Sequence, residues 1–284
     1  MLGRFFKRLI DAQEGWARPV GDFNHRWLSA LFRPMRPVKD FLNGTWLGHA
    51  LHPALTDLPI GALSLAVLFD LLDLRPAADI ALLFTLVAMV GAAAAGYADY
   101  TDTDGRPRVV ATVHSTLMTV ALALMVVSLL LRVGGPVDRT VPVVLGILAL
   151  LIVTAGAYIG GEVVYALGNM VDRHAWRAGG RKWTALDVTD VPEGTPTRAM
   201  AGTEALVLVR YGSTVHAMNA ICAHAGGPLD KGRVVDGCIE CPWHQSRFRL
   251  TDGHHAQGPT TFDQPVYEVR RDEAGTGYEA RRVG

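Results

Sequence analysis

The sequence predicts a mixed fold: a four-helix transmembrane bundle followed by a small all-β domain. Half of the 284 residues are hydrophobic and only 19% are charged, which is apolar for a soluble protein. The apolar residues form long runs between about residues 55 and 167, whereas the sequence after residue 179 mixes glycine, charge and short β-type segments. We therefore expect a basic amphipathic N-terminal segment (1–44), a transmembrane domain (45–170), a linker (171–182) and a β domain (183–282).

The first ten residues, MLGRFFKRLI, lack the apolar stretch and the cleavage site of a signal peptide. Basic side chains alternate with large apolar ones, which is typical of a short helix on a membrane surface. A helix packed against the rest of the protein has the same pattern, so both interpretations stay open.

Four segments are long and apolar enough to cross a bilayer, which takes roughly 20 residues each. They cover about residues 54–74, 79–98, 109–132 and 141–167, and Asp57 and Asp70 make the first the weakest. Buried helices of soluble proteins contain one such run, but four in succession predict a membrane domain. Small residues at 91–96 and 156–161 favour close packing of the second and fourth helices.

The distribution of Lys and Arg predicts the orientation in the plasma membrane. Four spans place both termini on one side, which carries fourteen Lys and Arg residues in segments 1–40, 99–108 and 173–182, against three on the other side. Both termini and the β domain are therefore expected to be cytoplasmic. The lipid bilayer is the first partner that the sequence predicts.

Polar residues gather near the terminal side of the predicted spans, among them His49, His52, His114 and Glu162. Ionisable residues at membrane depth are costly and indicate functional sites. His52 and His114 can face each other across the bundle and ligate a haem or another metal. A quinone or proton site and ordinary interfacial hydrogen bonding are the alternatives.

Short alternating runs after residue 182 predict strands at 183–188, 205–210, 214–219, 233–235, 246–250 and 266–270. Turn sequences such as Asp236-Gly237 and Asp252-Gly253 separate them. A segment of about 100 residues with this pattern predicts a small antiparallel β domain.

Two Cys–His pairs lie within this domain: Cys222-Ala223-His224 and, sixteen residues later, Cys241-Pro242-Trp243-His244. Two thiols and two imidazoles suit either zinc or the iron of an iron–sulfur cluster. Zinc-finger spacing places both cysteines before both histidines, whereas here each pair mixes the two. The pattern therefore favours an iron–sulfur centre over zinc.

The spacing and its neighbours resemble the Rieske [2Fe–2S] signature over about residues 183–282. Segment 222–229 is similar to its first cluster-binding loop, 241–248 to its second, and Gly258-Pro259 to the proline loop that covers the cluster. The resemblance implies an iron–sulfur-protein (ISP) type β fold with a rubredoxin-like cluster subdomain and one [2Fe–2S] cluster per chain. It implies Cys222, His224, Cys241 and His244 as iron ligands, and Gly227, Ser246 and Pro259 around the cluster.

Departures from the respiratory members of that family indicate the subtype. Those proteins carry a disulfide beside the cluster, and the corresponding positions here are Gly227 and Trp243. Ser246 matches their serine that hydrogen-bonds a bridging sulfide, but Phe248 replaces their tyrosine. Fewer hydrogen bonds to sulfur imply a lower potential, as in ferredoxin and oxygenase domains. Cys238 is expected to be a packed strand residue rather than half of a redox pair.

The segment from about Leu47 to Asn169 resembles an uncharacterised bacterial family of four-helix membrane proteins. The resemblance is carried by the motif His52-Pro53-Ala54-Leu55 and, three residues later, Leu58-Pro59-Ile60-Gly61. That family has no settled activity, but it occurs fused to Rieske domains. The resemblance therefore supports the architecture more than a mechanism.

Three functions are compatible with these features. The leading hypothesis is a membrane-anchored one-electron carrier at the cytoplasmic face, whose donor is a soluble reductase or a quinol and whose acceptor is unknown. The second is the electron-entry component of a membrane oxygenase or quinol-linked oxidoreductase, and the third is a redox sensor. An electron-transfer protein is favoured over a self-contained enzyme, because little sequence follows the cluster domain. No basic run with interleaved aromatics indicates nucleic-acid binding, and homo-oligomerisation stays open.

Overall fold

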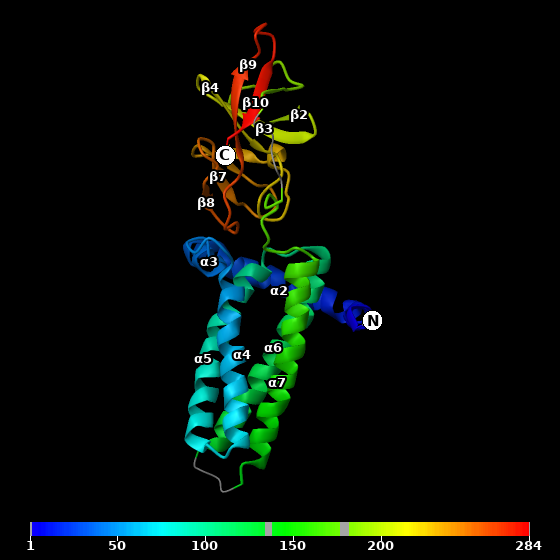
Figure 1. Cartoon of the computed structure of the whole chain (residues 1–284), viewed down its shortest axis with the longest axis vertical. Helices are drawn as coiled ribbons and strands as arrows, with labels where there is room; N and C mark the ends of the chain where they lie inside the picture. Colours follow the sequence, from blue (N-terminus) through cyan, green and yellow to red (C-terminus); the bar gives the residue numbers. More distant parts are fainter. Residues whose placement is uncertain (1, 134–137, 177–181, 284) are drawn as a thin grey trace. The chain divides into compact units, whose positions relative to one another are not determined.

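The computed structural model describes residues 2–133, 138–176 and 182–283, which fold into two compact units (Figure 1). The first unit contains residues 1–42 and 50–169, and the second contains residues 43–49 and 170–284. Residues 177–181 of the predicted linker lie outside the described residues.

Three helices precede the long helices of the first unit. They are α1 (Leu2–Asp11), α2 (Glu14–Phe32) and, after the 3-10 turn Arg33–Met35, α3 (Arg36–Asn43). One face of α2 buries Ala17, Gly21, Leu28 and Phe32. The hydroxyl of Tyr100, the last residue of a long helix, donates to the Gly21 carbonyl at 3.1 Å. The N-terminal segment is therefore helical and in part packed against the bundle.

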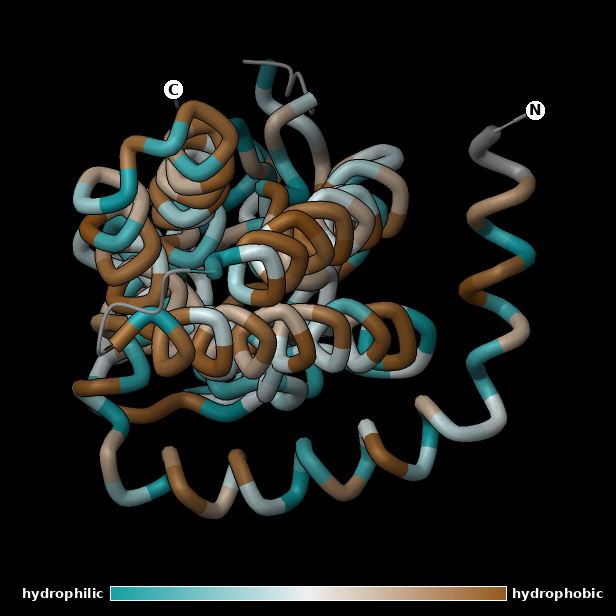
Figure 2. Tube along the Cα trace, turned by 90° about the horizontal axis from the view of Figure 1, so that it is seen from below, coloured by the Kyte–Doolittle hydropathy of each residue, from teal (hydrophilic) through white to brown (hydrophobic). Residues whose placement is uncertain are grey.

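A neighbouring face of α2 is apolar and exposed. Trp16, Val20, Phe23, Trp27 and Leu31 keep between 38% and 60% of their surface exposed. Their spacing of three or four residues places them in one stripe along the helix. Figure 2 shows α1 and α2 outside the bundle, where hydrophobic turns alternate with hydrophilic ones. The amphipathic character predicted for the first ten residues thus extends through α2.

Four long helices form the bundle: α4 (Leu51–Leu71), α5 (Arg75–Tyr100), α6 (Gly105–Arg132) and α7 (Thr140–Gly161). A π-helix (Glu162–Ala166) continues α7. These are the four predicted spans, with boundaries shifted by at most four residues. Only 22–28% of the most apolar window of each helix is buried within the protein, so the outer faces are largely apolar (Figure 2). The predicted four-helix bundle is confirmed, and its helices are long and apolar enough to cross a membrane.

The bundle consists of two hairpins, α4–α5 and α6–α7, which share one apolar core. Leu63, Leu82, Met125 and Ala149, one from each helix, are at most 1% exposed in it. Tight packing of this kind between helices with small and apolar faces is the usual source of association in lipid.

Charged residues join the hairpins where α4 and α6 end. The Arg132 Nη2 lies 2.6 Å from Asp70 Oδ2, and these side chains are only 2% and 3% exposed. Asp79 bonds both Arg132 and Arg139, at 3.1 Å and 2.7 Å. Asp70, one of the two aspartates that weaken the first predicted span, is therefore neutralised by Arg132 of the other hairpin.

The second unit is all-β, as predicted. Its strands are β1 (Thr184–Ala185), β2 (Thr197–Ala201), β3 (Glu204–Tyr211), β4 (Thr214–Asn219), β5 (Arg233–Val235), β6 (Cys238–Glu240), β7 (Arg247–Arg249), β8 (His255–Gln257), β9 (Val266–Arg271) and β10 (Tyr278–Arg282). They form a six-stranded sheet in the order β1-β10-β9-β4-β3-β2 and a four-stranded sheet in the order β5-β6-β7-β8. All pairs are antiparallel.

The sequence did not predict β2, β8 or β10, and of β6 it predicted only Cys238 as a packed strand residue. Strands β6 and β8 have three residues each, so they offer little alternation of apolar and polar residues. In β10, only Tyr278 and Ala280 are buried, and the residues between and after them are charged. Two apolar clusters form the core of this unit. Leu206, Leu208 and Ala217 of the six-stranded sheet lie in one cluster, whereas Met218 of the same sheet lies in the other, together with Ile239 and Phe248 of the four-stranded sheet.

Candidate metal centre

The first predicted ligand loop closes as a tight turn after β4. The Cys222 amide donates to the Gly227 carbonyl at 2.8 Å, and the Gly226 amide donates to the Cys222 carbonyl at 2.9 Å. Gly226 has a φ of +83°. Ile221 and Pro228 pair as an antiparallel bridge at the base of the loop.

The second predicted ligand loop repeats this turn with a different sequence. It joins β6 to β7, and the Cys241 amide donates to the Ser246 carbonyl at 2.8 Å, while the Gln245 amide donates to the Cys241 carbonyl at 3.1 Å. Gln245, at a φ of +64°, takes the position of Gly226. Each turn begins with a cysteine and carries a histidine two or three residues later. Two copies of one turn therefore offer the same pair of donors from two loops.

The four predicted ligand side chains gather between these loops. Cys222 and Cys241 are 1% and 2% exposed, and the His224 and His244 rings lie 5.0 Å apart between centroids at 87°. Hydrogen bonding between the two thiols lowers the pKa of Cys241 to about 7 and raises that of Cys222. One thiolate, the form that binds metal, is thus accessible near neutral pH. Two sulfurs and two imidazoles on facing loops fit the donor set of a histidine-ligated [2Fe–2S] cluster.

The residues predicted around the cluster are buried at the same loops. A Cβ on Gly227 would lie 2.7 Å from Cys241 Sγ, so a side chain at this position would displace the sulfur. Ser246 is fully buried, and its Oγ accepts a bond from the Thr260 amide at 3.2 Å. The serine hydroxyl proton remains for another acceptor, which fits the predicted bond to a bridging sulfide. Pro259, directly before Thr260, is also buried.

Gln264 is a supporting residue that the sequence did not indicate. Its Oε1 accepts from the Ala223 amide at 2.9 Å, and its Nε2 donates to the Asn219 and Ile221 carbonyls, both at 2.7 Å. Gln264 is 2% exposed. Because its partners lie more than forty residues away in the sequence, no local pattern marks it.

Glu240 holds the base of the second loop, and the sequence did not indicate it either. Its carboxylate bonds Arg233 at 2.7 Å and Arg247 at 2.6 Å, with only 6% of the side chain exposed. Burial alone raises the pKa of Glu240, but the bonds from Arg247 and Arg233 outweigh it and the pKa is lowered. The sequence did offer one signal for this pair. Glu240 directly precedes the loop and Arg247 follows it, and the two residues lie opposite each other in β6 and β7.

Residues that were assigned to the linker contact the first loop. The Arg173 amide donates to the Ala223 carbonyl at 3.2 Å, and His174 Nε2 bonds the Ile221 carbonyl at 2.8 Å. His174 is 5% exposed. The backbone on both sides of Cys222 is thus fixed from outside the loop.

One edge of the centre reaches the surface. Trp243 is 54% exposed and lies beside His244, with 6.4 Å between ring centroids, and His244 is partly exposed. Cys238, in contrast, is 7% exposed within β6, where the sequence placed a packed strand residue.

Two of the four polar residues predicted for a membrane site come together. The His52 and His114 rings lie 6.2 Å apart between centroids, at 73°. His49 is exposed and belongs to segment 43–49, which forms part of the second unit. Glu162 is the first residue of the π-helix.

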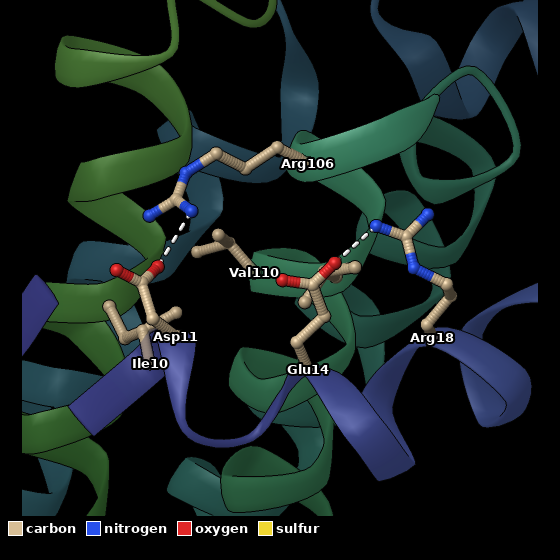
Figure 3. A pocket seen from close by; sticks show the side chains of 7 residues that line it. Ile10, Asp11, Glu14, Arg18, Arg106 and Val110 are labelled. Atoms are coloured by element: carbon tan, nitrogen blue, oxygen red, sulfur yellow. Dashed lines mark hydrogen bonds and ion pairs between the residues drawn. The ribbon is translucent and has the colours of Figure 1, made fainter. Parts of the chain in front are cut away.

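A separate cavity of about 150 Å³ lies between α1, α2 and α6 (Figure 3). Ile10, Val109 and Val110 supply its apolar wall. Its charged side chains are paired: Arg106 bonds Asp11 at 2.6 Å, and Arg18 bonds Glu14. The sequence did not indicate this cavity, and its paired charges mark it as a structural junction.

Comparisons with known proteins agree with this geometry. Residues 182–268 match the Rieske [2Fe-2S] domain family, and residues 48–173 match a predicted membrane protein family (DUF2231). The anthranilate 1,2-dioxygenase ferredoxin subunit of Burkholderia cepacia is 33% identical over 90 residues, which are 31% of this chain and 83% of that protein.

Two solved structures are similar to the second unit. One is the ferredoxin of carbazole 1,9a-dioxygenase from Nocardioides aromaticivorans IC177, with 28% identity over 35% of this chain and 97% of that chain, at a TM-score of 0.33. The other is a complex of reduced oxygenase and oxidized ferredoxin in carbazole 1,9a-dioxygenase, with 27% identity over 36% and 94% of the chains, at a TM-score of 0.32.

The Rieske match implies a [2Fe–2S] cluster and electron transfer. The chain therefore belongs to the Rieske [2Fe–2S] family, and it joins this electron-transfer domain to a membrane domain of the DUF2231 family.

Proposed function

We propose that the chain is a membrane-anchored one-electron carrier whose cluster, bound by Cys222, His224, Cys241 and His244, works at the cytoplasmic face of the plasma membrane. The observation that carries the proposal is the pair of equivalent loops, which buries both sulfur ligands and leaves the His244 edge partly exposed. A bound Rieske cluster supplies reversible one-electron chemistry.

The surrounding residues support this role by holding both loops in place. Gln264 fixes the backbone on either side of Cys222, and Glu240 fixes the base of the second loop. A site held by buried bonds keeps its geometry in both oxidation states, which favours fast transfer. Trp243 is the exposed aromatic beside a ligand, and aromatic residues of this kind are common at protein interfaces. We assign the docking edge for redox partners to Trp243 and His244.

The partner classes follow from the relatives. A similar protein is the ferredoxin subunit of a dioxygenase, and a similar solved ferredoxin is in complex with an oxygenase. The proposed donor is a soluble reductase or a quinol, and the proposed acceptor is an oxygenase or another oxidoreductase. A component of a membrane oxygenase and a redox sensor are the alternative functions.

Spectroscopy of the reduced protein tests the cluster assignment. The full chain is expected to show the anisotropic EPR signal of a histidine-ligated [2Fe–2S] cluster. Cys222→Ser removes a ligand and should abolish that signal, while Cys238→Ser should retain it. His244→Cys should lower the potential or lose the cluster, because a thiolate donates more charge than an imidazole. A zinc-only protein, or an unchanged potential in His244→Cys, would overturn the ligand assignment.

Repeated reduction and reoxidation of the cluster distinguishes an electron carrier from a redox sensor. A ferredoxin reductase with NADH and a one-electron acceptor dye should cycle the cluster many times in the wild-type chain. Trp243→Ala should slow reduction by the reductase without changing the EPR signal, since the residue is outside the ligand set. A cluster that is reduced once and passes no electron to any acceptor would favour the sensor instead.

We further propose that the bundle is a second redox station, which binds a haem or a quinone. Of the four residues that the sequence indicated, His52 and His114 support this most directly because their rings are in contact distance. The further roles of His49 and Glu162 stay predictions.

A further inference from the structure

His52 and His114 make the same hydrogen bond to the partner helix of their own hairpin. His52 in α4 donates Nδ1–H to the Ala92 carbonyl of α5, and His114 in α6 donates Nδ1–H to the Gly156 carbonyl of α7, both at 2.8 Å. A carbonyl oxygen only accepts, so the proton must be on Nδ1 in both rings.

Each histidine ring packs against a glycine that lies one helical turn beyond the carbonyl to which the ring donates. Gly96 is four residues after Ala92, and Gly160 is four residues after Gly156. A Cβ on Gly96 would lie 2.9 Å from the His52 ring, and one on Gly160 would lie 3.1 Å from the His114 ring. Both rings thus rest against a helix backbone, which a side chain at either glycine would prevent.

The two hairpins are related as repeats. Asp70 follows His52 by eighteen residues, and Arg132 follows His114 by eighteen residues. Residues at equivalent positions of the two hairpins lie close together. The centroids of the His52 and His114 rings are 6.2 Å apart, and Asp70 and Arg132 form an ion pair of 2.6 Å. Equivalent residues of two copies touch only at a two-fold axis, so both pairs mark one pseudo-two-fold axis along the bundle.

The protonation of the rings decides between a metal and a quinone. With the proton on Nδ1, the Nε2 atom of each neutral ring presents a lone pair. A backbone carbonyl on the other nitrogen is the usual outer partner of a metal-ligating histidine. A quinone carbonyl needs a hydrogen-bond donor, which neither Nε2 offers, and a quinol hydroxyl would use the lone pair of one Nε2 and leave the other unpaired. The pair therefore favours a metal.

The number of protein ligands decides which metal. Apart from the cluster ligands, the one group of three or more His, Cys, Asp or Glu side chains within the described residues whose ligand atoms all lie within 4.8 Å of one another is His254, His255 and Asp263, so no third such side chain joins the bundle pair. A structural zinc site takes four protein ligands, and calcium takes six or more oxygens. Haem iron has four nitrogens from its own macrocycle and takes its axial ligands from the protein.

The spacing of the rings agrees with axial ligation. Two imidazoles bound in line to one ion through bonds of about 2 Å place their ring centroids roughly 6 Å apart. The observed separation is 6.2 Å. Both rings are partly exposed in the protein, and the helix surface beside His52 is made of small residues, Ala92, Ala95 and Gly96. The surface that α5 presents to His52 is therefore made of small side chains.

We propose that His52 and His114 are the two axial ligands of one haem on the pseudo-two-fold axis. The proposal rests on the second redox station proposed above and is independent of the iron–sulfur cluster. It gives the membrane domain a cofactor of its own, held by one residue from each hairpin.

Haem content of the full chain tests the proposal. The protein is purified in detergent from cells supplied with iron and a haem precursor, and haem is measured by the pyridine haemochrome assay beside the cluster EPR signal. We expect a Soret band and one haem per chain. His52→Ala and His114→Ala should each bind roughly tenfold less haem, in line with the loss of a metal ligand, and should keep the cluster signal.

Two further variants separate ligation from folding. His25→Ala is the matched control, since His25 Nε2 bonds the Thr101 carbonyl at 3.0 Å in the same unit, and it should keep the haem. His52→Met keeps an axial donor, so it should retain haem with a shifted spectrum and a higher haem potential. Wild-type protein with an intact cluster signal but no Soret band, even after titration with haemin, would overturn the haem and leave the Rieske function standing. Haem retained in both alanine variants, or copper in its place, would also overturn it.

Discussion

At the scale of single residues, Gln264 is the side chain on which the first ligand loop depends most. Replacing it by leucine leaves the buried Ala223 amide without its acceptor and removes a donor from Asn219 and Ile221. An unsatisfied buried group costs about 1–3 kcal/mol. We expect Gln264→Leu to lower the melting temperature and to speed cluster loss, both followed by visible absorbance.

Gln264→Glu is the second variant, because it keeps the acceptor for Ala223 but turns a carboxylate oxygen toward the Asn219 and Ile221 carbonyls. Its stability at neutral pH should also fall well below that of the wild type, because a buried carboxylate then faces two acceptors. A leucine variant as stable as the wild type would show that Gln264 is dispensable for the loop.

Cys238 should behave as a packed residue. Burial raises the pKa of its thiol, so little thiolate is present at pH 8. We expect slow iodoacetamide labelling in the folded protein and rapid labelling in urea, read by mass spectrometry. Rapid labelling of the folded protein would instead point to an accessible redox thiol.

At the scale of elements, the ion pairs between the hairpins are the strongest polar contacts of the bundle. Arg132→Met leaves the Asp70 carboxylate, 3% exposed, without a partner. Breaking one side of a buried pair costs about 3–5 kcal/mol. We expect a large loss of thermal stability in detergent, and partial recovery in Asp70→Leu/Arg132→Met.

Arg139→Met is the comparison for that experiment. Its partner Asp79 is 31% exposed and keeps its bond to Arg132, so the loss should be smaller. Equal losses in Arg132→Met and Arg139→Met would contradict the importance of burial at Asp70.

The apolar stripe of α2 should lie in the membrane interface, since aromatic side chains concentrate there. Brominated lipids quench tryptophans that they touch. In liposomes, Trp16→Phe/Trp27→Phe should remove much of this quenching, and Trp183→Phe, in the β unit, should leave it unchanged. Quenching that survives the double substitution would place the stripe away from lipid.

At the scale of the whole molecule, the Lys and Arg distribution predicts cytoplasmic termini. A green fluorescent protein fused after Gly284 should fluoresce, and alkaline phosphatase at the same position should be inactive. The opposite pair of results would reverse the proposed orientation and place the Rieske unit outside the cytoplasm.

Much of this architecture was accessible from sequence because its signals are local. Long apolar runs predicted all four membrane spans, and the spacing of the Cys–His pairs indicated the Rieske family. Contacts between distant segments were not accessible: Gln264 reaches Ala223 across 41 residues, and Glu240 acts through strands of three residues. The His52–His114 pair was predicted as a contact, but its equivalent hydrogen bonds depend on helix register, which composition does not specify.

The ion pairs between hairpins also bear on how the chain enters a membrane. Asp70 and Asp79 belong to the α4–α5 hairpin, and Arg132 and Arg139 belong to the α6–α7 hairpin. Each hairpin alone would therefore carry uncompensated charge of one sign into the lipid, which is costly. During synthesis, the first hairpin has no partner for Asp70 until the second emerges. Its release into the bilayer should therefore wait for the second hairpin, so that the two enter as one unit.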